Sequence, residues 1–376
     1  MAELRIGTFT PAAPVVLAPM AGVTNAPFRT MCREFAPGLV YVNEMVMATA
    51  VVHGNAKTER MMTFTADEQP RSLQVYGSDP VMIGEAIRKI CAAGRVDHVD
   101  MNFGCPAAKV PRKGGGAAVP AKPNLLRAIL RSAVSAASPY GVPITAKFRK
   151  GLYDSLLTHL TTGRIAAEEG VAAIALHART AEQHYAGTAD WAAIGELKAA
   201  VPEIPVLGNG DIWEASDAVE MMHRTGCDGV VIGRGCLGRP WLFRDLVEAL
   251  NGRPVPPSPT LGEACDVMHR HAGLLCGHLG EHIAMRDFRK HAAWYLTGYP
   301  VGGELRRRFG MVSSLAELED LIAETDPATS IVEGGERIRR GHTNGPIRVA
   351  LPEGYLDHLD DLTVPDDGEV MALSGG

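Results

Sequence analysis

The sequence predicts an α/β fold: a (β/α)8 TIM barrel followed by a smaller all-α helical domain. Eight short apolar segments alternate with segments of helical spacing over roughly 240 residues, which is the usual size of such a barrel. Polar side chains follow nearly every strand, and barrels place their active sites at the carboxyl ends of strands. A doubly wound sheet is the alternative, but no Gly-x-Gly-x-x-Gly motif follows the first strand.

The eight predicted strands are short and rich in branched apolar residues. A helix over residues 25–35 follows the first strand, and Ser78, Asp79 and Pro80 predict the start of a helix that runs to about residue 91. The strands are expected at residues 14–22, 39–46, 71–77, 96–101, 143–149, 172–177, 205–207 and 228–232.

Composition shifts divide the rest of the chain. Residues 1–250 form the predicted catalytic barrel, and residues 251–260, rich in proline and polar residues, form a linker. Residues 261–345 are mostly helical in spacing and carry clustered cations. Residues 346–376 form an acidic C-terminal tail with no Lys or Arg after Arg348, and we expect part of it to be disordered.

The composition is that of an ordinary globular protein of 376 residues that is 46% hydrophobic. The net charge of −6 lacks the basic excess typical of nucleic-acid binders. No stretch predicts a membrane span or a secretion signal, so we expect a cytoplasmic protein without membrane contact. The seven cysteines have no metal-ligand spacing, which argues against a bound metal and for reduced thiols.

The most informative stretch is residues 96–119, where a predicted strand leads into Asn102, Cys105 and a glycine-rich loop. Gly104 permits close approach of a ligand, and the cations Lys109, Arg112 and Lys113 could hold an anionic substrate. Cys105 is therefore the candidate reactive group. The alternative is that Cys105 is an inert buried side chain, as most single cysteines are.

Two strand ends have the composition of a phosphate site. Residues 208–211 (GNGD) and 233–235 (GRG) follow the seventh and eighth strands, where barrels commonly bind phosphate through backbone N–H groups and an arginine. The alternative is that these glycines serve only tight turns. Their occurrence at both expected strands favours a phosphorylated ligand.

Three polar residues interrupt the predicted barrel strands. Lys147 lies in an apolar strand, where a buried ammonium needs an anion or polar ligand, unless it extends to solvent. Gln74 could bind the edge of a heterocycle or be a satisfied interior amide. His177, followed by Arg179, suits a hydrogen-bond donor to a phosphate or ring carbonyl better than a metal ligand.

These residues, in order and spacing, resemble the tRNA-dihydrouridine synthases, with the bacterial B-type class nearest. The resemblance covers roughly residues 14–250 and continues at residues 289–291 and 294–295. It is carried by residues 18–24 (APMAGVT), 43–45 (NEM), 74–77 (QVYG), 100–106 (DMNFGCP), 112–113 (RK), 177–180 (HART), 209–212 (NGDI), 233–234 (GR) and 238–241 (GRPW).

The resemblance implies a flavoprotein oxidoreductase with FMN at the barrel mouth and NADPH as the reductant. The reduced flavin would deliver hydride to C6 of a uridine in the tRNA D-loop, and Cys105 would protonate C5 to give dihydrouridine. By the same resemblance the cofactor-binding residues are Pro19, Met20, Ala21, Gln74, Lys147, His177, Asn209, Gly210, Asp211, Gly233 and Arg234.

The resemblance also implies a tRNA-binding role for the helical domain, in a protein expected to be a monomer. Asn102 would position the uracil. The substrate-binding residues would be Asn102, Lys109, Arg112, Lys113, Arg149, Arg179, Arg289 and Lys290.

This sequence departs from the family at residues 114–119 (GGGAAV), where the pattern Leu-Ala-Gly-Ser-Ala-Leu is common, so we expect a more mobile loop. Two alternatives stay open. One is an FMN barrel that reduces a small substrate of the dihydroorotate or dihydropyrimidine type. The other is a tRNA-binding module without catalysis.

Overall fold

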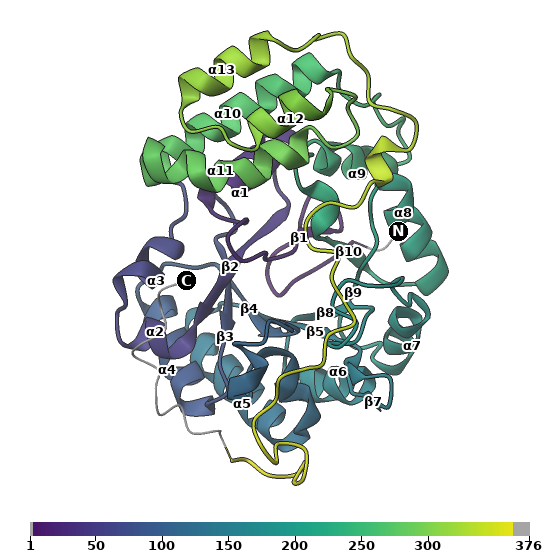
Figure 1. Ribbon diagram of the computed structural model, residues 1–376. Coiled ribbons are helices and arrows are strands. Elements are labelled where there is room, and N and C mark those ends of the chain that lie inside the picture. The colour runs from purple at the N-terminus through teal and green to yellow at the C-terminus, as the bar shows by residue number, and fades with distance from the viewer. Residues whose placement is uncertain (1–2, 364–376) are drawn as a thin grey trace.

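The computed structural model describes residues 3–363, and its centre is a closed barrel of eight parallel strands (Figure 1). The barrel order is β1-β10-β9-β8-β5-β4-β3-β2, and each predicted strand overlaps one of these elements, which confirms the predicted fold class. The strands are β1 (Val15–Leu17), β2 (Val40–Met47), β3 (Ser72–Tyr76), β4 (His98–Phe103), β5 (Ile144–Arg149), β8 (Ala173–His177), β9 (Val206–Asn209) and β10 (Gly229–Ile232).

Helices surround the barrel, and side-chain caps fix where several of them begin. Asn25 Oδ1 accepts the N–H of Phe28 at 3.1 Å, and Asp79 caps the next long helix in the same way, as its sequence predicts. The barrel helices are α1 (Ala26–Phe35), α2 (Ala48–Val52), α3 (Ala56–Met61), α4 (Pro80–Ala92), α5 (Pro123–Ala137), α6 (His159–Glu168), α7 (Ala192–Ala200), α8 (Ala215–Thr225) and α9 (Leu242–Leu250), with short 3₁₀ turns η1 (Pro111–Lys113), η2 (Gly116–Ala121), η3 (Ser138–Tyr140) and η4 (Arg234–Cys236).

A small antiparallel hairpin, which the sequence analysis did not predict, follows β5. It consists of β6 (Gly151–Tyr153) and β7 (Leu156–Leu157). A Cβ at position 151 would lie 2.2 Å from the Leu156 carbonyl oxygen, so the two strands approach closely only because residue 151 is glycine. The hairpin lies beside the barrel mouth, against η2.

The barrel interior combines an apolar cluster with buried polar side chains from β3, β4 and β5. Leu4, Ile6, Val40 and Val42 belong to an apolar cluster inside the barrel, which Ala173, Ala175, Leu207 and Val231 complete. Beside this cluster lie the buried side chains of Thr145, Asp100, Gln74 and Asn102, of which Asn102 is nearest the carboxyl end of its strand. Strand register therefore directs a band of polar groups toward the mouth of the barrel.

The helical part follows residues 251–260, which contain no helix or strand, and covers one side of the barrel mouth (Figure 1). It has its own core, in which Met268, Phe288, Tyr295 and Phe309 pack against Trp241 of the barrel. Its helices are α10 (Leu261–Leu279), α11 (Glu281–Tyr295), α12 (Gly303–Phe309) and α13 (Leu315–Ala323), followed by the 3₁₀ turn η5 (Gly335–Arg337).

The chain after η5 has no helix or strand up to residue 363 and runs back along the barrel, in yellow in Figure 1. Part of the chain past residue 351 was expected to be disordered; within the described residues, Tyr355 is only 4% exposed and packs against the barrel. Residues 364–376, the rest of the acidic tail, lie outside the described residues. No helix among residues 3–363 has the length and apolarity that a membrane crossing requires.

Candidate active site

Cys105 lies in a loop that Asn102 fastens to the end of β4. Asn102 Oδ1 accepts the backbone N–H groups of Gly104 at 3.0 Å and Cys105 at 2.9 Å. Cys105 is partly exposed, whereas the other described cysteines of the barrel are buried. The loop therefore presents this thiol at the mouth of the barrel, as the sequence predicts for a reactive group.

The Cys105 thiol is in its protonated form at neutral pH. Burial raises its pKa, and a hydrogen bond from the Ala107 N–H, together with the charges of Arg149 and Lys109, offsets part of that rise. A thiol with a raised pKa is a proton donor rather than a ready nucleophile. The site thus favours acid chemistry for Cys105.

A hydrogen-bonded chain of buried side chains inside the barrel holds Asn102 in place. Asn102 Nδ2 donates to Gln74 Oε1 at 2.9 Å, and Gln74 Nε2 donates to Asp100 Oδ2 at 2.7 Å. Thr145 donates to Asp100 Oδ1 at 2.6 Å and also contacts His98. Because each of these groups has a partner, the chain orients Asn102 rigidly and leaves both ends of its amide engaged.

Burial also governs the two titratable groups of this chain. It raises the pKa of Asp100, against hydrogen bonds from Thr145 and Gln74, and lowers the pKa of His98 to about 4. His98 is therefore neutral at physiological pH. A cavity of about 20 Å³ is lined by His98, Asp100, Thr145 and Lys147 and by a larger number of apolar residues such as Val40 and Leu207, and it is large enough for one water molecule.

Four cationic or titratable side chains converge where β5, β8 and β10 end. Arg149 is the register partner of His177, and His177 is that of Asn209. Lys147 Nζ donates to Asn209 Oδ1 at 2.9 Å. The guanidinium of Arg234, which follows β10, packs over the Tyr185 ring at 4.5 Å. The cluster lies around the strand ends that the sequence predicts as a phosphate site.

The mutual repulsion of these groups appears in their pKa values. Burial and Arg149 lower the pKa of Lys147 to about 8, and burial and Arg179 lower that of Arg234 to about 10. Burial and the surrounding cations hold the pKa of His177 well below its ordinary value, so this ring is neutral. An anion bound here would relieve the repulsion, which makes the cluster suitable for a phosphate.

The backbone around the cluster also fits a phosphorylated ligand. Gly210 has a φ of 124°, and a Cβ there would lie 2.7 Å from the Ala189 Cβ, so only glycine fits. At Gly233 a Cβ would meet only the Ala18 Cβ, at 3.9 Å, which leaves open space beside its backbone. Pro19 and Met20 are partly exposed and Ala21 is exposed, so the loop after β1 can border a planar ring. The residues present thus fit a flavin mononucleotide.

Arg179 and Arg149 do not lie where a substrate contact was expected. Arg179 is fully buried; its Nη2 donates to both carboxylate oxygens of Asp211 at 2.8 Å, and it also binds the carbonyls of Ala186 and Gly187. Arg149, 4% exposed, donates to the carbonyls of Gly104, Thr180 and His184. Both arginines hold loops of the site in place, and Asp211 is oriented by Arg179.

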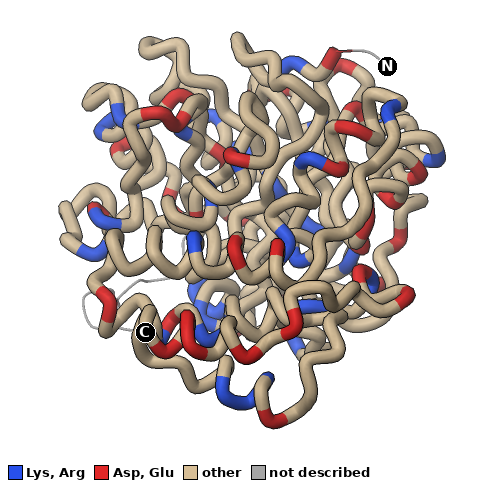
Figure 2. Tube along the Cα trace, turned by 90° about the horizontal axis from the view of Figure 1, so that it is seen from above, with Lys and Arg blue, Asp and Glu red and all other residues tan. Residues whose placement is uncertain are grey.

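The predicted tRNA-binding cations occupy two places. Lys109 and Arg112 are exposed and Lys113 is half-buried on the loop after Cys105. In α11, Lys290 Nζ donates to the Gly22 carbonyl at 2.7 Å, and Arg289 Nε donates to the Val312 carbonyl at 3.0 Å. Lys290 thus joins the helical part to the barrel mouth. Seen from above in Figure 2, Lys and Arg are interspersed with Asp and Glu rather than gathered on one basic face.

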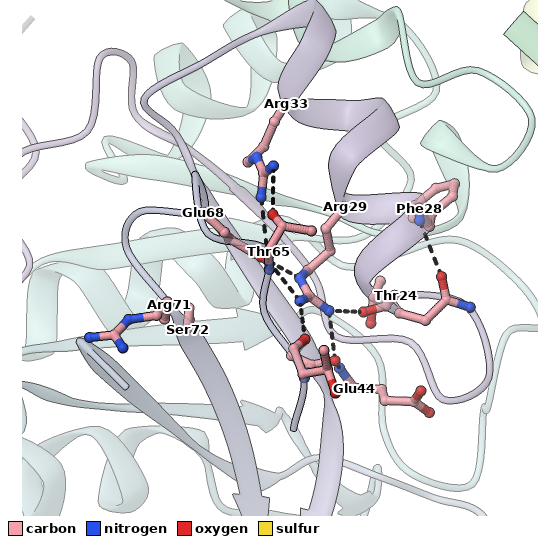
Figure 3. Close-up of polar contacts among 12 residues, drawn as sticks. Thr24, Phe28, Arg29, Arg33, Glu44, Thr65, Glu68, Arg71 and Ser72 are labelled. Atoms are coloured by element: carbon pink, nitrogen blue, oxygen red, sulfur yellow. Dashed lines mark hydrogen bonds and ion pairs between the residues drawn. The ribbon is translucent and has the colours of Figure 1, made fainter. Parts of the chain in front are cut away.

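A buried ion pair positions the loop between β1 and α1 (Figure 3). Arg29 of α1 pairs with Glu68, at 2.9 Å between Nη2 and Oε2, and its Nη1 donates to the Thr24 carbonyl and to Asn43. Asn43 Oδ1 also accepts the N–H of Glu44. The Glu44 carboxylate in turn accepts the Gly22 N–H at 2.8 Å. Through these contacts Arg29 fixes the loop after β1, which faces the predicted flavin site.

The glycine-rich departure at residues 114–116 is closely packed, although a more mobile loop was expected. All three glycines are buried. Gly116 has a φ of 54°, and a Cβ there would lie 2.8 Å from the Cys105 carbonyl oxygen. The absence of side chains lets this segment lie directly against the cysteine loop.

Comparisons with known proteins agree with this site. Residues 16–330 match the family described as dihydrouridine synthase (Dus). The chain belongs to the dihydrouridine synthase family. It is 52% identical to a probable tRNA-dihydrouridine synthase of Mycobacterium tuberculosis (strain H37Rv) over 99% of this chain and 97% of the relative. It is 38% identical to tRNA-dihydrouridine synthase B of Pseudomonas putida over 82% of this chain and 90% of the relative.

Solved structures add evidence for the fold alone. Histamine dehydrogenase from Rhizobium sp. 4-9 matches with a TM-score of 0.50 and 10% identity, covering 86% of this chain and 64% of that one.

As a dihydrouridine synthase family member, the protein is an oxidoreductase. No group of three or more potential metal-ligating side chains lies together among residues 3–363.

Sequence reasoning missed three parts of this dihydrouridine synthase site. Asp100 precedes Asn102 by two residues, so strand alternation could have placed both inside the barrel. Thr145 relates to Lys147 in the same way. Tyr185, which lies beneath Arg234 and Arg149, follows β8 in an irregular loop, and nothing in its spacing marks it.

A cavity of about 460 Å³ between residues 62–71 and 94–97 contains none of the predicted site residues.

Proposed function

We propose that this protein reduces the C5=C6 bond of a uridine in the D-loop of tRNA to 5,6-dihydrouridine, with FMN as its flavin and NADPH as the reductant. The observation that carries the proposal is the pairing of two features at one barrel end. One is a protonated, partly exposed Cys105 on a loop held by Asn102. The other is the cluster in which the cations Lys147 and Arg234 surround the neutral ring of His177.

The residues that would hold FMN divide by position. Pro19, Met20 and Ala21 would border the ring system, and Lys147 and Gln74 would contact it. The ribityl chain and phosphate would be held by His177, Asn209, Gly210, Asp211, Gly233 and Arg234. When bound, a reduced flavin supplies the hydride that C6 receives.

Cys105 would supply the proton. Saturation of the double bond adds a hydride at C6 and a proton at C5, so the S–H bond of Cys105 breaks as the C5–H bond forms. The resulting thiolate would be stabilised by the Ala107 N–H and by the charge of Arg149, and it would regain a proton from solvent. A raised thiol pKa keeps the acid protonated between turnovers.

Asn102 would act mainly on the cysteine loop. Because its Oδ1 accepts two loop N–H groups and its Nδ2 donates to Gln74, its amide is engaged before any substrate arrives. Contact with the uracil, which the family resemblance implies, would need a free lone pair or hydrogen of this amide. The exposed cations Lys109 and Arg112 would contact the tRNA backbone.

The test uses the purified protein, NADPH and tRNA transcripts. The expected result is a yellow protein that is reduced by NADPH and converts one or more uridines of the D-loop to a product two mass units heavier, detected by nucleoside mass spectrometry. Reduction of orotate-like or free pyrimidine substrates with no reaction on tRNA would favour the small-substrate alternative. A colourless protein that binds tRNA would favour the non-catalytic one.

A further inference from the structure

The chain past the helical part crosses the mouth of the barrel. Residues 341–363, here named the C-terminal strap, lie outside the family match, which ends at residue 330. The N–H of Tyr185 donates to the Asn344 carbonyl at 3.1 Å, and the N–H of Ile347 donates to the Glu182 carbonyl at 2.8 Å. Arg234 Nη1 donates to the His342 carbonyl at 2.6 Å. The strap thus runs along the loop that follows β8 and meets the phosphate end of the site.

The far end of the strap is anchored by Tyr355. This side chain is 4% exposed, its ring lies 4.7 Å from Lys122 Nζ, and its hydroxyl makes a long hydrogen bond of 3.3 Å to the Gly114 carbonyl. At that length the hydroxyl contributes little, so the ring is the main anchor. It packs in one apolar cluster with Val349 and with Ala117, Ala118 and Ala121 of η2.

The segment beneath Tyr355 is in direct contact with the catalytic loop. The N–H of Ala117 donates to the Cys105 carbonyl at 3.2 Å. Gly116 lies so close to Cys105 that a Cβ at position 116 would collide with its carbonyl oxygen. Tyr355 therefore reaches Cys105 through a single layer of backbone, residues 114–118.

The strap contributes its buried apolar side chains to a cluster separate from the main barrel core. The main barrel core contains no strap residue, and Val349 and Tyr355 belong only to the small cluster at the barrel mouth. The other members of that cluster are on η2, on the β6-β7 hairpin and at Ala181. The buried apolar residues of the strap, Val349 and Tyr355, thus lie against segments at the barrel mouth that include η2.

We propose that Tyr355 is a positioning residue for the reaction, which holds residues 114–118 against Cys105 and so keeps the cysteine loop closed and its thiol directed at the substrate base. The proposal rests on the proposed function, because it deepens the role given there to Cys105. It also fits the glycine at position 116, since a Cβ there would collide with Val110 and with the Cys105 carbonyl oxygen.

The test compares Tyr355→Phe, Tyr355→Ala and the matched control Tyr140→Ala in the full-length, flavin-bound protein. Tyr140, the last residue of η3, is 43% exposed and lies outside the site. Three quantities are measured: the rate of iodoacetamide alkylation of Cys105 relative to buried Cys91, the rate of flavin reduction by NADPH, and the single-turnover rate with tRNA.

In Tyr355→Ala, alkylation of Cys105 should rise about tenfold because the loop opens more often. The single-turnover rate with tRNA should fall by about tenfold to a hundredfold, since small misplacements of a reacting group are costly. Flavin reduction should not change. Tyr355→Phe, which keeps the ring, should restore both altered values to near those of the unsubstituted protein, and Tyr140→Ala should alter none.

Unchanged Cys105 alkylation and tRNA turnover in Tyr355→Ala would overturn the proposal, as would a variant that only lowers the melting temperature. If Tyr355→Ala does not fold, Tyr355→Leu, which keeps most of the volume but not the contact with Lys122, provides the same comparison. The alkylation assay needs no tRNA. It therefore tests the strap even if the unsubstituted protein fails to make dihydrouridine, an outcome that would refute the proposed function separately.

Discussion

Asn102 and Cys105 are joined by a hydrogen bond of 2.9 Å from the Cys105 N–H to the Asn102 side chain. The carboxyl end of β4 thus fixes the loop that bears the thiol. Asn102 is in turn held by Gln74 and, through it, by Asp100. The position of the proposed acid is thus set by the barrel interior rather than by the loop alone.

Replacement of Asn102 by Ala should therefore disturb the reaction with tRNA more than the binding of flavin. Without the Oδ1 acceptor, the N–H groups of Gly104 and Cys105 lose their partner, and we expect the single-turnover rate to fall by about a hundredfold. Stopped-flow oxidation of the reduced enzyme by tRNA measures this. The control is Asn251→Ala, an exposed amide beyond α9. An unaltered rate in Asn102→Ala would refute the positioning role.

The rate with tRNA should depend on pH through the Cys105 thiol. The acid must be protonated, and burial raises its pKa, so activity should persist above the ordinary thiol pKa and decline only as pH rises through the raised value. The rate of flavin reduction by NADPH should not share this decline. A tRNA rate that already falls between pH 7 and 8, where a lowered thiol pKa would act, would contradict the assignment.

The Arg29–Glu68 pair should dominate the stability of the β1-α1 region. Both side chains are buried, at 0% and 1% exposure, so Arg29→Met leaves the buried Glu68 carboxylate with its longer ion pair to Arg33, at 3.3 Å, and should reduce the free energy of unfolding by about 3 kcal/mol. Urea unfolding is measured for the single variants, in which either Arg29 or Glu68 is replaced, and for the double variant. The comparison gives the coupling energy between Arg29 and Glu68. The exposed pair Arg307–Glu304 is the control, and its removal should have no measurable effect. Equal effects of the two pairs would show that burial does not matter here.

Binding of tRNA should weaken as salt increases, because Lys and Arg side chains displace counterions from phosphates. Lys109→Gln and Arg112→Gln should each reduce the slope of log affinity against log salt by about 1 if each contacts a phosphate. Arg253→Gln, an exposed cation in the linker that pairs with Glu248, should leave the slope unchanged. A slope that is the same in all variants would place the tRNA elsewhere.

The sequence predicts best those features that depend on residues close together in the chain. The alternation of apolar strands with helices predicts the barrel, and the Asn25 and Asp79 caps fix where α1 and α4 begin. It also brought Lys147, His177 and Asn209 to one barrel end, because parallel strands end at the same face.

What failed depends on contacts between distant residues. Arg179 was expected to meet the substrate, yet its burial against Asp211 depends on how the loop after β8 folds back. Tyr355 lies against the segment that contains Gly114, although it is more than two hundred positions away in the sequence. Neither relationship leaves a periodic or spacing signal in the sequence.

The most direct test of the whole account is the Cys105→Ala variant under single turnover. The flavin should remain bound and should be reduced by NADPH at the rate of the unsubstituted protein, while formation of dihydrouridine in tRNA falls by about 10²- to 10⁴-fold through loss of the acid. Unchanged formation of dihydrouridine in this variant would contradict the account.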